Sequence, residues 1–105
     1  MGYTYSMLDI VQSETFSRWL SKLKDRAAIM RVNARLRRFS ETGNFGDAKP
    51  ARDGVSEIRI DYGPGYRLYY IQSGPVLVIL LAGGDKRTQD ADIKRAIDIS
   101  KEWKP

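Results

Sequence analysis

Hydrophobic and polar residues alternate along residues 54–72, and this alternation predicts two antiparallel β-strands. The strands span residues 55–62 and 66–72, and Gly63-Pro64-Gly65 supplies the turn between them. Residues 76–82 follow a second turn and are apolar throughout, which is typical of a central strand covered on both sides. These patterns predict a three-stranded sheet around which the rest of the chain is organised.

A short turn sets the expected register of the hairpin. It pairs Tyr62 with Tyr66 and places Ile60 opposite Leu68. Because successive side chains of a strand point to opposite faces, this register separates an apolar face from a polar face. The apolar face holds Ile58, Ile60, Tyr62, Tyr66, Leu68 and Tyr70, and the polar face holds Glu57, Arg59, Asp61, Arg67 and Tyr69. The apolar face needs a core, and the polar face is the place to look for function.

Two amphipathic helices are expected before the sheet. Ser13 is suited to cap the first helix, in which apolar residues recur at i, i+3, i+4 and i+7. Asp25 is suited to cap the second helix, which ends at residues 42–44. The first apolar stripe is Phe16, Trp19, Leu20 and Leu23, and the second is Ile29, Val32, Leu36 and Phe39. We interpret the aromatic rings in these stripes as core residues rather than as platforms for stacking bases.

A strand near the N-terminus and a helix near the C-terminus complete the predicted fold. The strand contains Tyr5, Leu8, Ile10 and Val11, and the helix spans residues 88–103. Residues 44–53 are rich in Gly, Asp and Pro and are expected to form a loop. The sequence thus predicts one α+β domain, residues 1–105, in the order strand, helix, helix, three antiparallel strands, helix. The two N-terminal helices are expected to cover one face of the sheet, and the C-terminal helix part of the other.

The composition favours a polyanionic partner. The 105 residues include 18 Lys and Arg against 13 Asp and Glu, which gives a net charge of +5 and a pI near 9.6. The absence of cysteine and histidine excludes disulfides, thiolate chemistry and histidine-based metal sites. No apolar run approaches the roughly 18 residues of a membrane span, and the N-terminus does not resemble a signal peptide. These features predict a cytoplasmic protein that binds nucleic acid or an acidic protein.

Several cations are expected near the polar face of the hairpin. Lys49 and Arg52 precede the hairpin, and Lys86 and Arg87 follow the central strand in the segment 83–87, expected to be a Gly-rich turn that can contact phosphate. We expect an open concave patch around Arg59, Arg67, Tyr69 and Lys86. The plainer alternative is that the two hairpin arginines only pair with Asp61 and Glu57, which would contribute little at a surface.

The motifs together resemble the RelE/ParE superfamily of bacterial toxins, and most closely its HigB-like, phage Gp49-related group of addiction-module killer proteins. The resemblance is carried by residues 54–60 (GVSEIRI), 63–70 (GPGYRLYY) and 83–89 (GGDKRTQ), together with Lys49-Pro50 and the apolar stripe of the first helix. It covers nearly the whole chain from about Leu8. It implies a RelE-like fold, a small antiparallel sheet flanked by helices, in agreement with the element order above.

The resemblance also implies an activity and site residues. RelE and HigB members are metal-independent endoribonucleases, mRNA interferases that cut mRNA in the ribosomal A site and block translation. By this resemblance Arg67 contacts the scissile phosphate, Arg59 is the basic residue of the preceding strand, and Lys86 or Arg87 is the cation after the last strand. Asp92 and Ile93 stand where RelE toxins have a base-stacking tyrosine, so that role is either lost or taken by another ring such as Tyr69.

Without histidine, cations must carry most of the chemistry of RNA cleavage. Arg67 with Lys86 or Arg87 would stabilise the negative charge of the transition state. Lys86 or Lys49 is the candidate for proton transfer, with Glu57 as another possible base. Lys49, Arg52, Tyr69 and Glu57 are therefore the expected RNA-binding residues, and neither a metal nor a cofactor is expected.

The expected partners are the ribosome, mRNA and a cognate antitoxin, a small helix-turn-helix protein encoded beside this gene. The complex of toxin and antitoxin would bind its own operator DNA. Two other readings remain open: a ParE-like toxin that inhibits DNA gyrase without hydrolysis, and a non-catalytic module that binds nucleic acid or an antitoxin.

Overall fold

The computed structural model describes residues 7–103 and has the α+β architecture that the sequence predicts. Its elements are β1 (Asp9–Gln12), α1 (Glu14–Lys22), α2 (Arg26–Thr42), β2 (Ala48–Arg52), β3 (Val55–Ile60), β4 (Tyr66–Ser73), β5 (Leu77–Asp85), the 3-10 turn η1 (Lys86–Thr88), α3 (Gln89–Ser100) and the 3-10 turn η2 (Lys101–Trp103). Tyr5, which we expected in the first strand, lies outside the described residues. No described helix has both the length and the apolar character needed to cross a bilayer.

The five strands form one sheet in the order β1-β5-β4-β3-β2. β1 runs parallel to β5, and all other neighbours are antiparallel. The expectation of a loop at residues 44–53 is wrong in its second half, because β2 pairs with β3 at the edge of the sheet. Charged residues and Pro50 hide this strand in the sequence, and proline is tolerated in an edge strand, which pairs on one side only.

The predicted register of the β3–β4 hairpin is wrong by two residues. Ile60 pairs with Tyr66 and Ile58 with Leu68, so that residues 61–65 form a longer turn. A shift by an even number of residues leaves every side chain on its predicted face. The apolar and polar faces of the hairpin are therefore those that the sequence predicts.

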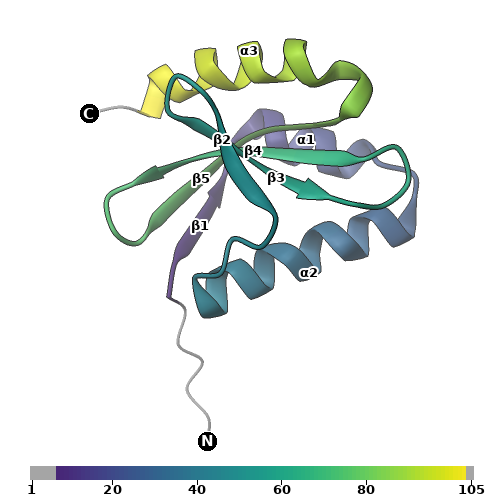
Figure 1. Ribbon diagram of the computed structural model, residues 1–105, viewed down its shortest axis with the longest axis horizontal. Helices are drawn as coiled ribbons and strands as arrows, with labels where there is room; N and C mark the ends of the chain where they lie inside the picture. Colours follow the sequence, from purple (N-terminus) through teal and green to yellow (C-terminus); the bar gives the residue numbers. More distant parts are fainter. Residues whose placement is uncertain (1–6, 104–105) are drawn as a thin grey trace, which may run out of the picture.

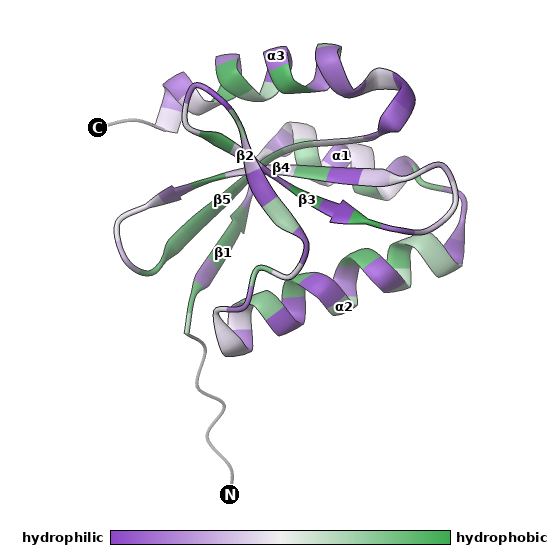
Figure 2. Ribbon diagram, in the orientation of Figure 1, coloured by the Kyte–Doolittle hydropathy of each residue, from purple (hydrophilic) through white to green (hydrophobic). Residues whose placement is uncertain are grey.

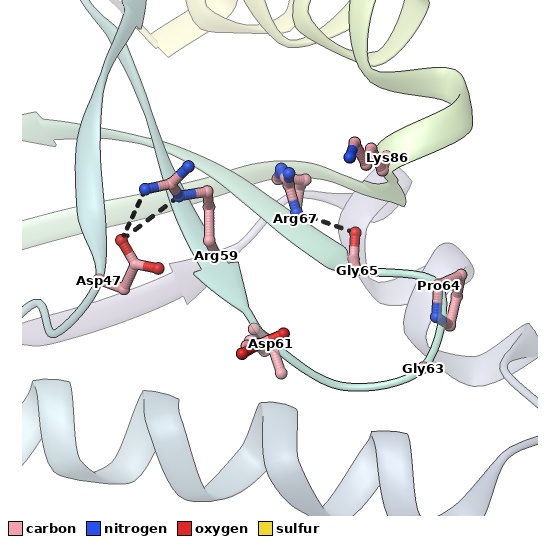
Figure 3. A pocket seen from close by; sticks show the side chains of 9 residues that line it. Asp47, Arg59, Asp61, Gly63, Pro64, Gly65, Arg67 and Lys86 are labelled. Atoms are coloured by element: carbon pink, nitrogen blue, oxygen red, sulfur yellow. Dashed lines mark hydrogen bonds and ion pairs between the residues drawn. The ribbon is translucent and has the colours of Figure 1, made fainter.

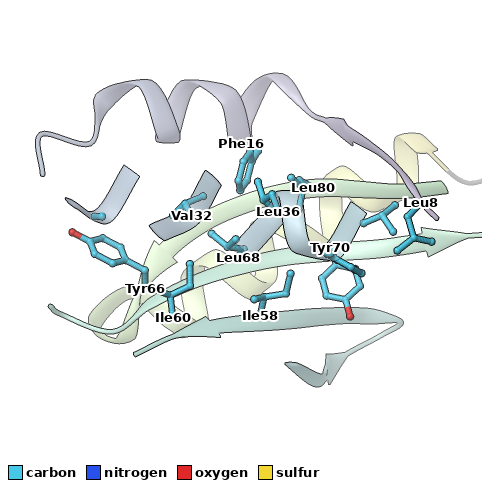
Figure 4. Close-up of a cluster of buried hydrophobic side chains, with 13 residues drawn as sticks. Leu8, Phe16, Val32, Leu36, Ile58, Ile60, Tyr66, Leu68, Tyr70 and Leu80 are labelled. Carbon is cyan, nitrogen blue, oxygen red and sulfur yellow. The ribbon is translucent and has the colours of Figure 1, made fainter. Parts of the chain in front are cut away.

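The sheet lies between two helical layers (Figure 1). α1 and α2 pack on the apolar face of the hairpin, and α3 packs on the other face. Figure 4 shows Phe16, Val32 and Leu36 directed onto Leu68 and Leu80. The core beneath α3 comprises Val55, Tyr69, Ile79, Leu81, Ala82, Ile93 and Ala96. β5 contributes to both cores, which explains the hydrophobic colour of most of the strand in Figure 2.

The predicted caps of α1 and α2 and the predicted end of α2 are confirmed, whereas α3 spans Gln89–Ser100 rather than residues 88–103. The Ser13 hydroxyl accepts a hydrogen bond from the Phe16 amide and donates one to the Leu81 carbonyl, which ties α1 to β5. The Asp25 carboxylate accepts from the Ala28 amide at the start of α2. Gly43 ends α2 in the left-handed conformation, with φ of 70°.

The Gly-rich turn expected at residues 83–87 is wrong, because β5 continues to Asp85. A Cβ on Gly83 would lie 2.2 Å from the Trp19 ring, and a Cβ on Gly84 would lie 1.8 Å from Asp92 Oδ2. Both glycines are therefore explained by close packing of α1 and α3 against the strand, rather than by phosphate binding.

Candidate functional site

Two arginines lie opposite each other on the polar face of the β3–β4 hairpin. Arg59 and Arg67 are directly paired in the register, and both are partly exposed. Like charges in this position destabilise a sheet by roughly 0.2–1 kcal/mol, relative to neutral pairs. An anion bound between the two guanidinium groups would offset this repulsion, which makes the pair a candidate phosphate site.

Asp47 holds the side chain of Arg59 in place. Arg59 donates to Asp47 Oδ1 from Nη2 at 3.1 Å and from Nε at 3.3 Å, and its backbone amide donates to the Asp47 carbonyl at 2.8 Å. Figure 3 shows this pair at one end of the site. Because the contact uses Nε and Nη2, the Nη1 group of Arg59 has no partner within the described part of the chain.

The hairpin turn positions Arg67. Its Nη1 group donates to the Gly65 carbonyl at 3.0 Å, while its buried Nε has no hydrogen-bond partner among residues 7–103. Gly65 has φ of 80°, and a Cβ there would lie 3.3 Å from Arg67 Nη1. Glycine is thus favoured at this position both by its backbone conformation and by the approach of the guanidinium group.

Lys86 supplies a third cation from the end of β5. It is exposed in η1, and its Cβ would lie 3.7 Å from a Cβ placed on Gly65. Within the residues that the structure describes, no carboxylate lies within 4.0 Å of the charged groups of Lys86 or Arg67. Figure 3 shows the nitrogen-bearing ends of Arg59, Arg67 and Lys86 along one side of the sheet.

These cations line a cavity of about 420 Å³, which we call the hairpin cavity. Its lining residues are Asp47, Arg59, Ile60, Asp61, Gly63, Pro64, Gly65, Arg67 and Lys86. Since Asp47 is occupied by Arg59, the charges left for a ligand are those of Arg67, Lys86 and Asp61. A cavity with two cations and one carboxylate that have no ion-pair partner among residues 7–103 is suited to bind a phosphodiester and to exchange protons with it.

Comparison of the sequence with known proteins finds a relative of the same size. The chain is 52% identical over 95 residues to an uncharacterized protein of Haemophilus influenzae, and the match covers 90% of this chain and 95% of the relative. The two proteins belong to one family. No model of a described protein family matches the sequence.

Solved structures identify the fold. A mutant of the Escherichia coli toxin RelE in the free state superposes with a TM-score of 0.62 at 17% identity, over 87% of this chain and 98% of that one. The RelBE2 toxin–antitoxin complex of Mycobacterium tuberculosis contains a chain with a TM-score of 0.52 at 22% identity, over 75% and 91%. The chain has the RelE fold. The HigB-like assignment within that fold stays a prediction.

On this RelE fold, Arg87 lies apart from the hairpin cavity. Its Nη2 group pairs with Asp85 Oδ2 at 3.0 Å, and its side chain lines a neighbouring depression with Lys86 and Gln89. The hydrogen bond from Arg87 lowers the pKa of Asp85, and the same contact raises the pKa of Arg87. Of the two candidates for the cation after the last strand, Lys86 is therefore the one that faces Arg67.

The expected exposure of Tyr69 and Glu57 is wrong. Both side chains lie beneath α3, with 0% and 1% of their surface exposed. Burial and the nearby Glu57 carboxylate raise the pKa of Tyr69, whose hydroxyl has no hydrogen-bond partner in the described part of the chain. Glu57 accepts from Gln89 Nε2 at 3.1 Å. Neither side chain can contact a base in this conformation. The two residues lie on the polar face of the hairpin, and α3 covers that part of the face.

Lys49 and Arg52 also lie outside the hairpin cavity. Lys49 Nζ is 3.8 Å from Glu57 Oε1 and remains half-exposed, while Arg52 Nη2 is 2.8 Å from Asp90 Oδ1. The first contact joins β2 to the buried Glu57 of β3, and the second joins β2 to α3. The exposed part of the Lys49 side chain can still contact a ligand. The ion pair of Arg52 with Asp90 of α3 accounts for Arg52 without a role in RNA binding.

Sequence reasoning missed two residues that shape the site, Asp47 and Gly65. Asp47 faces Arg59 only because β2 pairs with β3, and this strand was not predicted. Gly65 was recognised as a turn residue, but its carbonyl contact with Arg67 depends on the longer turn. Among residues 7–103, no three His, Cys, Asp or Glu side chains are grouped so that they could hold a metal ion.

Proposed function

We propose that this protein is the toxin of a type II toxin–antitoxin pair, a ribosome-dependent endoribonuclease that cleaves mRNA without a metal ion. The observation that supports the proposal is the hairpin cavity, in which Arg59 of β3, Arg67 of β4 and Lys86 of η1 converge without full compensation by carboxylates among the described residues. Folding gains nothing from such a cluster, whereas a dianionic phosphorane is stabilised by it. The RelE fold, seen also in a toxin–antitoxin complex, supports the assignment.

The residues of the cavity can be given roles in cleavage. The 2′-oxygen of the RNA attacks the phosphorus, its proton passes to a base, and the bond from phosphorus to the 5′-oxygen breaks. Asp61 is the carboxylate in the cavity that is free to accept the 2′-proton, and the Lys86 ammonium can donate a proton to the 5′-oxygen. Arg67 and Arg59 stabilise the charge on the phosphoryl oxygens. The products are a 2′,3′-cyclic phosphate and a 5′-hydroxyl end.

An antitoxin is the second part of the proposal. The net charge of +5 suits an acidic segment that covers the hairpin cavity and blocks entry of RNA. We propose that this antitoxin is a small protein encoded beside the gene, that it carries a helix-turn-helix domain, and that the complex binds its own operator DNA.

Expression in growing bacteria tests the function. We expect translation to stop and sequencing of mRNA ends to reveal cuts within codons, and we expect Arg67→Ala to abolish both effects. Arg37→Ala, which removes an exposed arginine of α2 that does not line the cavity, is the matched control and should remain toxic. Induction of the SOS response with intact mRNA would instead indicate a gyrase inhibitor, and absence of toxicity in every form would indicate a non-catalytic binding module.

A further inference from the structure

A second cationic cavity opens between α1 and α3, at the end of β5. It has a volume of about 220 Å³, and we call it the α1–α3 cavity. Its lining residues are Thr15, Arg18, Trp19, Lys22, Gly83 and Arg95. The cations come from two helices that lie on different faces of the sheet, so the cavity is a feature of the tertiary fold rather than of one helix surface.

The topology of the sheet creates this cavity. β1 pairs with β5 only as far as Leu80, so the remaining part of β5 has no strand on that side in the described structure. α1 and α3 approach each other around this open edge. The Trp19 ring lies directly against Gly83, where a Cβ would be 2.2 Å from the ring. Trp19 packs against the core as expected, and part of its surface remains exposed in the cavity.

The charges around the ring are only partly compensated. Arg18 pairs with Glu14 at 2.6 Å, and both side chains are largely exposed. In the part of the chain that the structure describes, no carboxylate lies within 4.0 Å of the charged groups of Lys22 or Arg95. Two free cations beside a partly exposed indole ring form the combination that binds single-stranded nucleic acid, with phosphate on the cations and a base on the ring.

The α1–α3 cavity is a neighbour of the hairpin cavity. Gly83 lines one and Lys86 the other, and three residues of extended chain span at most about 11 Å. The two cavities are therefore close enough for one RNA strand of a few nucleotides to contact both.

We propose that the α1–α3 cavity binds a flanking nucleotide of the single-stranded RNA substrate, with its base against Trp19 and its phosphate between Lys22 and Arg95. This inference rests on the proposed function, because it assigns a position to the RNA that the hairpin cavity would cleave. It gives Trp19 and Arg95 the role of positioning the substrate, at a distance from the bond that breaks.

Fluorescence of Trp19 tests the proposal directly. The chain has two tryptophans, so Trp103→Phe leaves Trp19 as the only one. The probe is a ten-nucleotide single-stranded RNA of mixed sequence with 2′-O-methyl groups, which cannot be cleaved through the 2′-oxygen. We expect the RNA to quench the fluorescence of Trp19 and to protect it from iodide. Unchanged fluorescence at saturating RNA, with binding detected independently by anisotropy, would overturn the proposal.

A pair of variants on α3 provides the matched comparison. Arg95→Ala should weaken binding of the same RNA about tenfold, and should reduce the slope of log K against log salt by about 0.7, as expected for loss of one phosphate contact. Lys94→Ala removes the adjacent cation, which is paired with Asp90 at 3.2 Å outside the cavity, and should leave both quantities unchanged. Equal losses in the two variants, or equal quenching of Trp19 by polyglutamate, would contradict an RNA site.

The test separates this inference from the function on which it rests. If mRNA cleavage depends on Arg67 but RNA does not change the fluorescence of Trp19, the proposed function stands and only the RNA site in the α1–α3 cavity is contradicted. Quenching that depends on Arg95, in a protein that cuts no mRNA, would support the α1–α3 cavity as an RNA site and contradict the nuclease.

Discussion

Substitution of Gly84 by alanine tests how α3 is fitted to the sheet beside the hairpin cavity. Gly84 pairs with Arg67 in the register, and α3 begins five residues later. A Cβ at this position would lie 1.8 Å from Asp92 Oδ2, 2.7 Å from Asp92 Cγ and 3.0 Å from Thr88 Oγ1. Asp92 is buried and accepts a hydrogen bond from Thr88, so its carboxylate cannot move aside freely.

The sign of the change in the free energy of unfolding shows whether a Cβ at position 84 clashes with Asp92 or fits without a clash. Gly84 does not have a positive φ, so a substitution without a clash would stabilise the fold by about 0.4–1 kcal/mol through the unfolded chain. Overpacking against Asp92 costs about 1–3 kcal/mol. The net expectation is a loss of about 1–2 kcal/mol, which corresponds to a fall in Tm of roughly 4–16 °C for a domain of this size.

Equilibrium unfolding in urea and thermal melting followed by circular dichroism measure this change. Gly74→Ala is a control, since no atom lies within 4 Å of a Cβ there and its cost comes only from φ of 74°. Combination of Gly84→Ala with Asp92→Ala should recover part of the loss, giving a coupling energy above about 0.5 kcal/mol. If Gly84→Ala is as stable as the wild type or more stable, the close packing of α3 on β5 is wrong.

Three further predictions follow from single contacts. Tyr69→Phe removes a buried hydroxyl that has no partner among the described residues, so the free energy of unfolding should rise by about 1 kcal/mol. The rate of mRNA cleavage should not change, and a loss of cleavage would indicate that Tyr69 does take part in RNA binding. Asp47→Asn should lower the free energy of unfolding, measured by urea titration, by less than about 1 kcal/mol. It should also lower the cleavage rate, because Arg59 loses the ion pair that holds its side chain. An unchanged rate would show that this ion pair is not needed for cleavage. Burial raises the pKa of Asp92 above its ordinary 3.8, so its contribution to stability is complete below that value and is lost as the pH rises through the raised pKa. Asp92→Asn should therefore gain stability relative to the wild type as the pH rises from below 3.8 through the raised pKa, and a stability difference that does not change with pH would contradict the raised pKa.

The sequence was sufficient for the faces of the hairpin but not for its register. Alternation fixes which side chains share a face, and it gives the same answer for Ile60 opposite Leu68 and for the observed pairing of Ile60 with Tyr66. The length of the turn is a local property that Gly63-Pro64-Gly65 does not determine alone. Arg59 and Arg67 were therefore placed on the correct face, although the pairing between them could not be predicted.

The errors in the candidate site have a common physical origin. Tyr69 and Glu57 are polar in the alternating pattern, and such residues are usually exposed, but here α3 covers them and Gln89 satisfies the carboxylate. The position of α3 depends on tertiary contacts, such as the close packing of Asp92 against Gly84, that the hydrophobic pattern does not encode. β2 was missed because its sequence contains charged residues and a proline, which are typical of a loop but are also tolerated in an edge strand.

The rate of mRNA cleavage by Arg67→Ala is the most direct test of the hairpin cavity as a catalytic site. Purified wild-type and variant proteins are added to programmed ribosomes, and single-turnover cleavage is measured at saturating enzyme, with Arg37→Ala as the charge-matched control. Loss of one preorganised donor to the phosphoryl oxygens should lower the rate by about 10²–10³-fold, while the control remains at the wild-type rate. Equal rates for Arg67→Ala and Arg37→Ala would contradict the central claim that the cations of the hairpin cavity cleave RNA.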